Sequence, residues 1–196
     1  MGIKLERYDP QKHDKKVLAE LIFKSDEEMN ALVYGNNATE IIKILLDMPE
    51  SYFLPEYTRC AMLDNELVGV IVRFPVSQRK EVDKNAGQGF IKAMGFFGFI
   101  RKMALYMKMQ KMLGGVLDHD GMYIHTLCVD GRFRGKGIGT EMLQAIAEEN
   151  SKMYLYVNTK NEGAIRFYKR NGFYEKFHGK LKYKGQVLGE YLMERK

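Results

Sequence analysis

One short segment combines glycines and cations in a pattern suited to binding an anion. It consists of Arg134, Gly135, Lys136, Gly137, Ile138, Gly139 and Thr140. Each glycine costs a helix about 1 kcal/mol relative to alanine, yet an apolar helical pattern follows at once. A helix N-terminus presents unpaired backbone N–H groups that bind phosphate when no side chain obstructs the approach. The segment therefore predicts a phosphate-binding loop, with added charge from its arginine and lysine and a hydroxyl from its threonine.

Two common phosphate loops do not fit this spacing. A Walker loop needs serine or threonine directly after the lysine, whereas Gly137 follows Lys136. A Rossmann fingerprint needs a third glycine at the position that Thr140 occupies. The loop therefore matches neither of these two patterns.

The loop is expected to lie between a strand and a helix. Residues 122–130 alternate like a strand, and a helix is predicted from the loop to Asn150. Residues 152–157 predict the next strand, and residues 162–171 a short helix that ends at Gly172.

The remaining elements are expected on weaker patterns. They are a strand at 3–8, a helix at 14–29, a helix capped by Asn37 with Glu40 three residues on, a hairpin at 59–74 and two final strands joined at Lys184–Gly185. Residues 84–116 are rich in Phe and Met and predict a helical insertion. A packed helix, a lid over an acceptor pocket, a dimer contact and an interfacial membrane helix remain open for it. Its longest uncharged stretch, 93–100, is too short to span a bilayer.

Two motifs in this order resemble the GNAT superfamily of N-acetyltransferases. The first is the family's acetyl-CoA loop, Arg/Gln-x-x-Gly-x-Gly/Ala, which residues 134–139 fit. The second is Asn161, then Tyr168 seven residues on, then Gly172–Phe173. The close resemblance covers about residues 123–175.

The resemblance implies an α/β (α+β) fold: a central mixed sheet with a splayed strand pair, flanked by helices, in a single acetyltransferase domain over residues 1–196. It implies acetyl-CoA as the cosubstrate. The backbone of Leu127, Cys128 and Val129 would bind the pantetheine arm, the loop from Arg134 to Thr140 the pyrophosphate, and Asn161 the cofactor near its pantetheine.

Acetyl transfer to an amine needs a base for the ammonium, a donor for the oxyanion and a proton for the departing thiolate. By resemblance Tyr168 is the proton donor. His125 is the candidate base, because a histidine pKa near 6.5 suits neutral pH; strand alternation places its side chain with those of Tyr123, Leu127 and Val129. Cys128 is expected to face away, which disfavours a covalent role.

Two branches of the family differ at informative positions. Serotonin N-acetyltransferases carry two histidines where this chain has Tyr123 and His125. Acetyltransferases of ribosomal-protein N-termini place a glutamate where this chain has Tyr156, which argues against that substrate. Glu27, Glu28 and Glu40 could attract a cationic amine.

Charge and composition restrict the classes of partner and the cellular location that we expect. Residues 151–196 contain eleven Lys or Arg and four Glu, a net charge of +7, so the other 150 residues sum to −1 against the total of +6. This suits a polyphosphate cofactor or a nucleic acid, but the segment has no recognisable nucleic-acid motif. Cys60 and Cys128 have no metal-like spacing, and no secretory signal is apparent. We therefore expect a cytoplasmic location, no metal, no nucleic-acid partner and no stable membrane span, with a homodimer left open.

The sequence thus favours an acetyl-CoA-dependent N-acetyltransferase that acts on a primary amine of a small molecule or peptide by direct attack. The alternative is a non-catalytic acyl-CoA-binding sensor or partner module.

Overall fold

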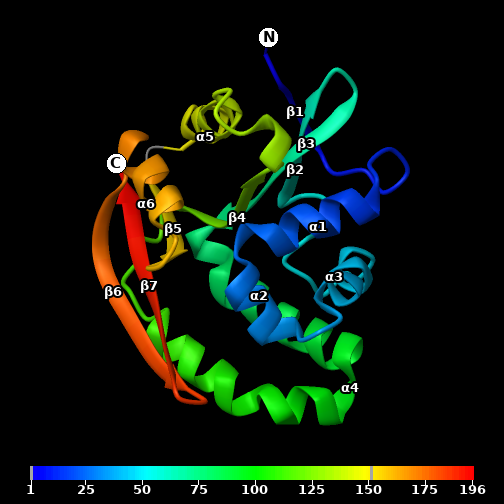
Figure 1. Ribbon diagram of the computed structural model, residues 1–196, viewed down its shortest axis with the longest axis vertical. Helices are drawn as coiled ribbons and strands as arrows, with labels where there is room; N and C mark the ends of the chain where they lie inside the picture. The colour runs from blue at the N-terminus through cyan, green and yellow to red at the C-terminus, as the bar shows by residue number, and fades with distance from the viewer. Residues whose placement is uncertain (1, 151) are drawn as a thin grey trace.

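A mixed seven-stranded sheet with helices on both faces forms the protein (Figure 1). This computed structural model describes residues 2–150 and 152–196. The strands lie in the order β1-β2-β3-β4-β5-β7-β6. They are β1 (Lys4–Arg7), β2 (Thr58–Leu63), β3 (Glu66–Pro75), β4 (Met122–Val129), β5 (Met153–Asn158), β6 (Tyr174–Tyr183) and β7 (Gln186–Arg195). The helices are α1 (Lys15–Ser25), α2 (Glu27–Tyr34), α3 (Ala38–Leu46), α4 (Arg79–Met112), α5 (Ile138–Ala147) and α6 (Glu162–Arg170), with 3-10 turns at Val76–Gln78 and Gly131–Phe133. The flanked mixed sheet that the sequence predicts is confirmed.

Strand β3, which lies between β2 and β4, is buried on both faces. Val70 and Val72 pack in the cluster that includes α1 and α3, whereas Val68 and Ile71 pack with α5. A β-branched run without polar alternation suits a strand covered on both sides.

Strands β4 and β5 are parallel and separate part-way along their length. Their pairing runs only from Met122↔Met153 to Ile124↔Leu155. Beyond Ile124, β4 keeps its partner β3 on one side, while its other edge no longer pairs with β5. The expected splayed pair is present, and it leaves strand edges free inside the fold.

A β-bulge in β4 corrects the expected side-chain alternation. Thr126 pairs with Val72 but Ile124 pairs with Arg73, so His125 is an extra residue on its strand. A bulge moves later side chains to the opposite face. His125 therefore does not share a face with Leu127 and Val129 as strand alternation predicts.

Two helix predictions near the N-terminus are also corrected. The expected helix at 14–29 is divided into α1 and α2 at Asp26, whose side chain accepts a hydrogen bond from the Met29 N–H and so caps a new helix. Asn37 precedes α3 but makes no side-chain capping bond. Helix α5 ends at Ala147 rather than at Asn150.

Helix α4 is the predicted insertion, displaced to Arg79–Met112 and kinked at Gly95, where φ is 72°. It runs along the bottom of the molecule in Figure 1 and packs against β6, where a Cβ on Gly179 would stand 1.8 Å from the Met112 carbonyl oxygen. Near the kink, Phe96 and Phe97 are 63% and 82% exposed. Among the described residues no helix is long and apolar enough to cross a membrane.

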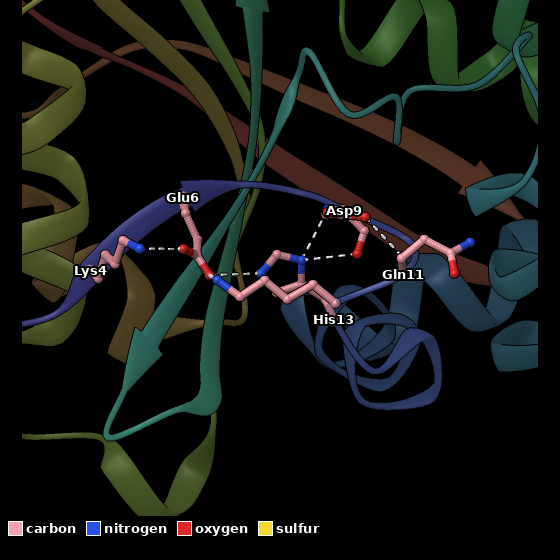
Figure 2. A network of polar contacts seen from close by, with 6 residues as sticks. Lys4, Glu6, Asp9, Gln11 and His13 are labelled. Atoms are coloured by element: carbon pink, nitrogen blue, oxygen red, sulfur yellow. Dashed lines mark hydrogen bonds and ion pairs between the residues drawn. The ribbon is translucent and has the colours of Figure 1, made fainter.

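A polar network ties the first strand to the loop before α1 (Figure 2). His13 Nδ1 lies 2.9 Å from the Asp9 N and 3.1 Å from the Asp9 carbonyl oxygen, and Nε2 lies 3.2 Å from the Glu6 carboxylate. Lys12 and Lys4 also pair with Glu6, and these contacts, that of Lys12 first, lower the pKa of Glu6 to about 2.

Glu6→Gln is expected to destabilise the fold by about 1 kcal/mol at pH 7, since partly exposed ion pairs contribute little more. A depressed carboxyl pKa stabilises the folded state above the unfolded value near 4.5. The difference in the free energy of unfolding between wild type and variant should therefore vanish as pH falls from about 4.5 to about 2. Urea unfolding at several pH values measures it. Glu40→Gln, which removes an exposed pair with Lys43, is the control; an equal effect there would contradict the prediction.

Candidate active site

A single cavity of about 1110 Å³ opens at the splay between β4 and β5. Its walls come from α2, α4, β4, β5, α6, β7 and the glycine loop. It brings together His125 and Tyr168, the two candidate catalytic residues. Nearly every candidate cofactor residue lines it: Leu127, Cys128, Val129, Arg134, Gly135, Gly137, Ile138, Gly139, Thr140 and Asn161.

The glycine loop is built to expose its backbone. Gly135 and Gly137 have φ of +77° and +83°, a conformation that favours glycine, and a Cβ on either would enter open space. The backbone N–H groups from Gly135 to Gly139 donate no hydrogen bond within the described chain. Gly137 precedes the first residue of α5, so these amides form the helix N-terminus. Five free amides and a helix dipole suit an anion.

Two members of the loop differ from expectation. Lys136 does not line the cavity, and its Nζ lies 4.9 Å from the centroid of the Phe133 ring. Gly139 lines the cavity, but a Cβ there would stand 3.0 Å from the Phe167 ring. Close packing of α5 against α6 therefore also requires this glycine.

The free edge of β4 borders the same cavity. Leu127, Cys128 and Val129 pair with β3 on one side and face the splay on the other. One acceptor is already used, because Arg134 Nε donates to the Val129 carbonyl oxygen at 3.1 Å. The rest of this edge can pair with an extended ligand as an added strand would.

Helix α6 supplies the remaining candidates. Tyr168 is 7% exposed, its ring packs edge-on against Phe167 and Phe173, and its hydroxyl makes no hydrogen bond with the described residues. Burial, with a smaller contribution from Cys128, raises the pKa of Tyr168 above its usual range, so the phenol keeps its proton. Asn161 caps α6 by accepting from the Ala164 N–H at 3.0 Å.

The model of the acetyltransferase (GNAT) family matches residues 20–173. The chain belongs to this family. It is 47% identical over 58 residues to an uncharacterised N-acetyltransferase of Methanocaldococcus jannaschii, covering 27% of this chain and 26% of that one. It is 32% identical over 73 residues to a spermine/spermidine N(1)-acetyltransferase of Bacillus subtilis, covering 34% and 47%. The matched segments thus span about a quarter and about half of these relatives' own lengths.

The GNAT fold extends over nearly the whole chain. An N-acetyltransferase structure from Staphylococcus aureus Mu50 superposes with a TM-score of 0.66 at 16% identity, over 96% of this chain and 99% of that one. The family uses acetyl-CoA. The open glycine loop and the unpaired β4 edge fit that molecule, since one offers free amides and the other free strand groups.

His125 is held among aromatic rings at the bulge. Its ring stacks on Tyr52 with centroids 4.2 Å apart, and its Nδ1 lies 2.8 Å from Thr126 Oγ1. Burial, and then the charge of Arg79, lower the pKa of His125 to about 4. The expected pKa near 6.5 is therefore wrong for this environment, and the imidazole is neutral at pH 6 and above.

We expect His125→Gln to lower the rate less than tenfold, and by the same factor from pH 6 to pH 9. The reason is that the imidazole has no titration in this range and acts by its position. A pH–rate profile with one acceptor measures this. A loss that grows below the acceptor's own pKa would instead establish His125 as the base.

The bulge also changes the position of Cys128. Its side chain packs in the cluster that contains Phe53, a ring neighbour of His125, and it lines the cavity instead of facing away from the other candidates. Burial raises the pKa of the thiol. A thiol kept protonated is a poor nucleophile.

No sequence pattern predicts a role for Tyr52, Arg79 or Asp83. Arg79 lies over the Tyr123 ring at 4.8 Å, Tyr52 donates to Asp83 at 2.9 Å, and all three line the cavity. So does Glu190 on β7. The sequence does contain a signal for Glu190. It lies two residues from both Leu188 and Leu192, so it shares the apolar face of its strand.

Of the three glutamates that the sequence suggested for attracting an amine, none lines the cavity. Glu28 is instead bonded to Asn158 and Lys160, at 2.9 Å and 2.6 Å.

Proposed function

We propose that this chain transfers the acetyl group of acetyl-CoA to a primary amine of a small molecule or peptide by direct attack. One observation carries the proposal: the same cavity is lined by the anion-binding loop, by the free β4 edge, and by tyrosine, histidine and carboxyl side chains. A ligand held by the loop and the edge would thus reach side chains that can move protons.

Each part of the site has a role in this proposal. Acetyl-CoA supplies an acetyl group activated as a thioester. The free amides of Gly135 to Gly139 and the Thr140 hydroxyl hold the pyrophosphate, since the Thr140 N–H donates to the Gly137 carbonyl oxygen. The β4 edge from Leu127 to Val129 orients the pantetheine, and Asn161 contacts it nearby. Tyr168 protonates the sulfur as it leaves, since its unbonded phenol keeps its proton at neutral pH.

The other walls of the cavity suggest the acceptor. Phe90, Tyr106 and Met109 from α4 offer an apolar surface, which suits an acceptor with an aliphatic or aromatic body. The Bacillus subtilis relative is named for spermine and spermidine. Polyamines therefore come first in a screen of acceptors.

Two measurements test the proposal. CoA should raise the melting temperature more than ATP or NAD does, because ligand at 100 times its Kd stabilises by about 2.7 kcal/mol. Thiol release from acetyl-CoA should then accelerate with one or more amines from a panel of polyamines, aminoglycosides and peptides. CoA binding without release by any amine would favour the alternative, a non-catalytic acyl-CoA-binding module.

We further propose one domain, a cytoplasmic location and a contact between two copies of the chain. The free thiols of Cys60 and Cys128 support a reducing environment. The exposed Phe96 and Phe97 support a contact surface on α4.

A further inference from the structure

Glu190 is a buried carboxyl without a partner. It lies on β7 opposite Asn158 of β5, is 4% exposed and lines the cavity. Among the described residues, none of the side-chain hydrogen bonds or ion pairs involves its carboxyl group, whose oxygens are not among the fully enclosed unpaired atoms and are open to the cavity. Buried charged groups are normally paired, because an unpaired one loses its hydration without compensation.

Glu194, on the same strand and the same face, shows the usual arrangement. It is 2% exposed, its carboxylate pairs with Lys176 at 3.0 Å, and it accepts from the Tyr154 hydroxyl at 3.2 Å. It does not line the cavity. The carboxyl that faces the cavity is therefore the one left free for a ligand.

The groups around Glu190 make the cavity favourable to a cation. Asp26 and Glu28 approach it from the start of α2, and Glu28 is already paired with Lys160. Tyr123 of β4 and Tyr156 of β5 line the same cavity and interact electrostatically with Glu190; the Tyr156 hydroxyl donates to the Leu113 carbonyl oxygen at 2.7 Å. From α4, Arg79 lies over both of these tyrosine rings, so its positive charge is stacked on aromatic surface.

We propose that the Glu190 carboxyl binds the ammonium group of an aliphatic primary amine and takes its proton before the amine attacks. This inference rests on the proposed acetyl transfer. An N–H bond of the ammonium breaks and an O–H bond forms on Glu190. The freed lone pair makes the amide C–N bond, the C–S bond breaks, and the sulfur takes the proton of Tyr168. The attacking nitrogen then loses its second proton as the amide forms, and this proton restores the Tyr168 phenol. Glu190 then returns its proton to solvent.

The proton affinities of the two partners are matched. Burial first, and then the charges of Asp26 and Glu28, raise the pKa of Glu190 to about 9. An aliphatic ammonium has a pKa of about 10, so transfer to Glu190 is unfavourable by about one pKa unit, or tenfold. Transfer to His125, with a pKa of about 4, is unfavourable by about a million-fold.

Calorimetry with CoA-bound protein tests the assignment without any turnover. The probes are butylamine, 1,4-diaminobutane and spermidine, titrated at pH 7.5 in two buffers of different ionisation enthalpy. Free Glu190 is protonated at this pH, and the bound pair holds one proton between carboxyl and amine. We therefore expect release of about one proton for each amine bound.

Glu190→Gln should weaken binding at least tenfold and abolish the proton release, whereas the matched variant Glu194→Gln should change neither. Unchanged affinity or unchanged proton release in Glu190→Gln would overturn the assignment, as would failure of all three amines to bind. Amine binding by a protein that never releases CoA from acetyl-CoA would contradict the proposed function instead.

The stability of Glu190→Gln separates loss of the site from loss of the fold. A raised carboxyl pKa means that ionisation favours the unfolded chain between the unfolded value near 4.5 and about 9. The amide has no such penalty. The variant should therefore melt a few degrees above wild type at pH 7.5, and the gap should widen from pH 5 to pH 9. A variant that melts below wild type throughout this range would show that the carboxyl is not held in the protonated form.

Discussion

Replacing Tyr168 by phenylalanine is expected to lower the acetyl-transfer rate about 100-fold, the usual size of one general-acid contribution. The ring stays in place against Phe167 and Phe173, so packing should survive. The Kd of CoA should change less than threefold, because the hydroxyl acts when the thiolate leaves. Steady-state kinetics and calorimetry measure the two effects separately.

Tyr8→Phe provides the control for this substitution. Tyr8 is also buried, at 2% exposure, and its hydroxyl has no hydrogen-bond partner among the residues that the structure describes, but it lies outside the cavity. Its loss should leave turnover unchanged. Full activity of Tyr168→Phe across the pH range would remove Tyr168 from its proposed role.

A valine at Gly137 is expected to raise the Kd of CoA well over tenfold. The side chain would enter the open space in front of the free amides, where the phosphate oxygens are proposed to lie. A β-branched residue at a φ of +83° also strains the backbone and lowers the stability of the fold. This loss of stability must be separated from the loss of CoA affinity.

Gly185→Val imposes a matched strain away from the site. Gly185 has a φ of +80°, and a Cβ there also meets open space, in the turn between β6 and β7. Both variants should lose similar stability by thermal melting, but only Gly137→Val should lose CoA affinity by calorimetry. Normal CoA binding by Gly137→Val would show that the loop does not hold the phosphates.

Local sequence predicted the parts of the fold that depend on nearest neighbours. The hairpin at Asp64–Asn65 forms with both residues at positive φ, and Gly172 ends α6 at a φ of +83°. The glycine loop was predicted for the same reason, because helix start, missing side chains and flanking cations are all local properties. The break at Asp26 is local too, because the Asp26 side chain caps α2 by accepting from the Met29 N–H, although the apolar periodicity over 14–29 predicts one continuous helix.

The sequence by itself determined the family, the sheet with its helices and the anion-binding loop, since each follows from motif spacing or short-range periodicity. Only the tertiary structure decided the protonation states of the site residues and which residues line the acceptor part of the cavity. The bulge at His125 arises from pairing with β3, a strand about 50 residues away, and it moves Cys128 toward the cavity. Burial lowers the pKa of His125 and raises the pKa of Glu190, because it disfavours whichever form of a group is charged. No local pattern encodes that burial, which depends on α2, α4 and β7 closing around one cavity.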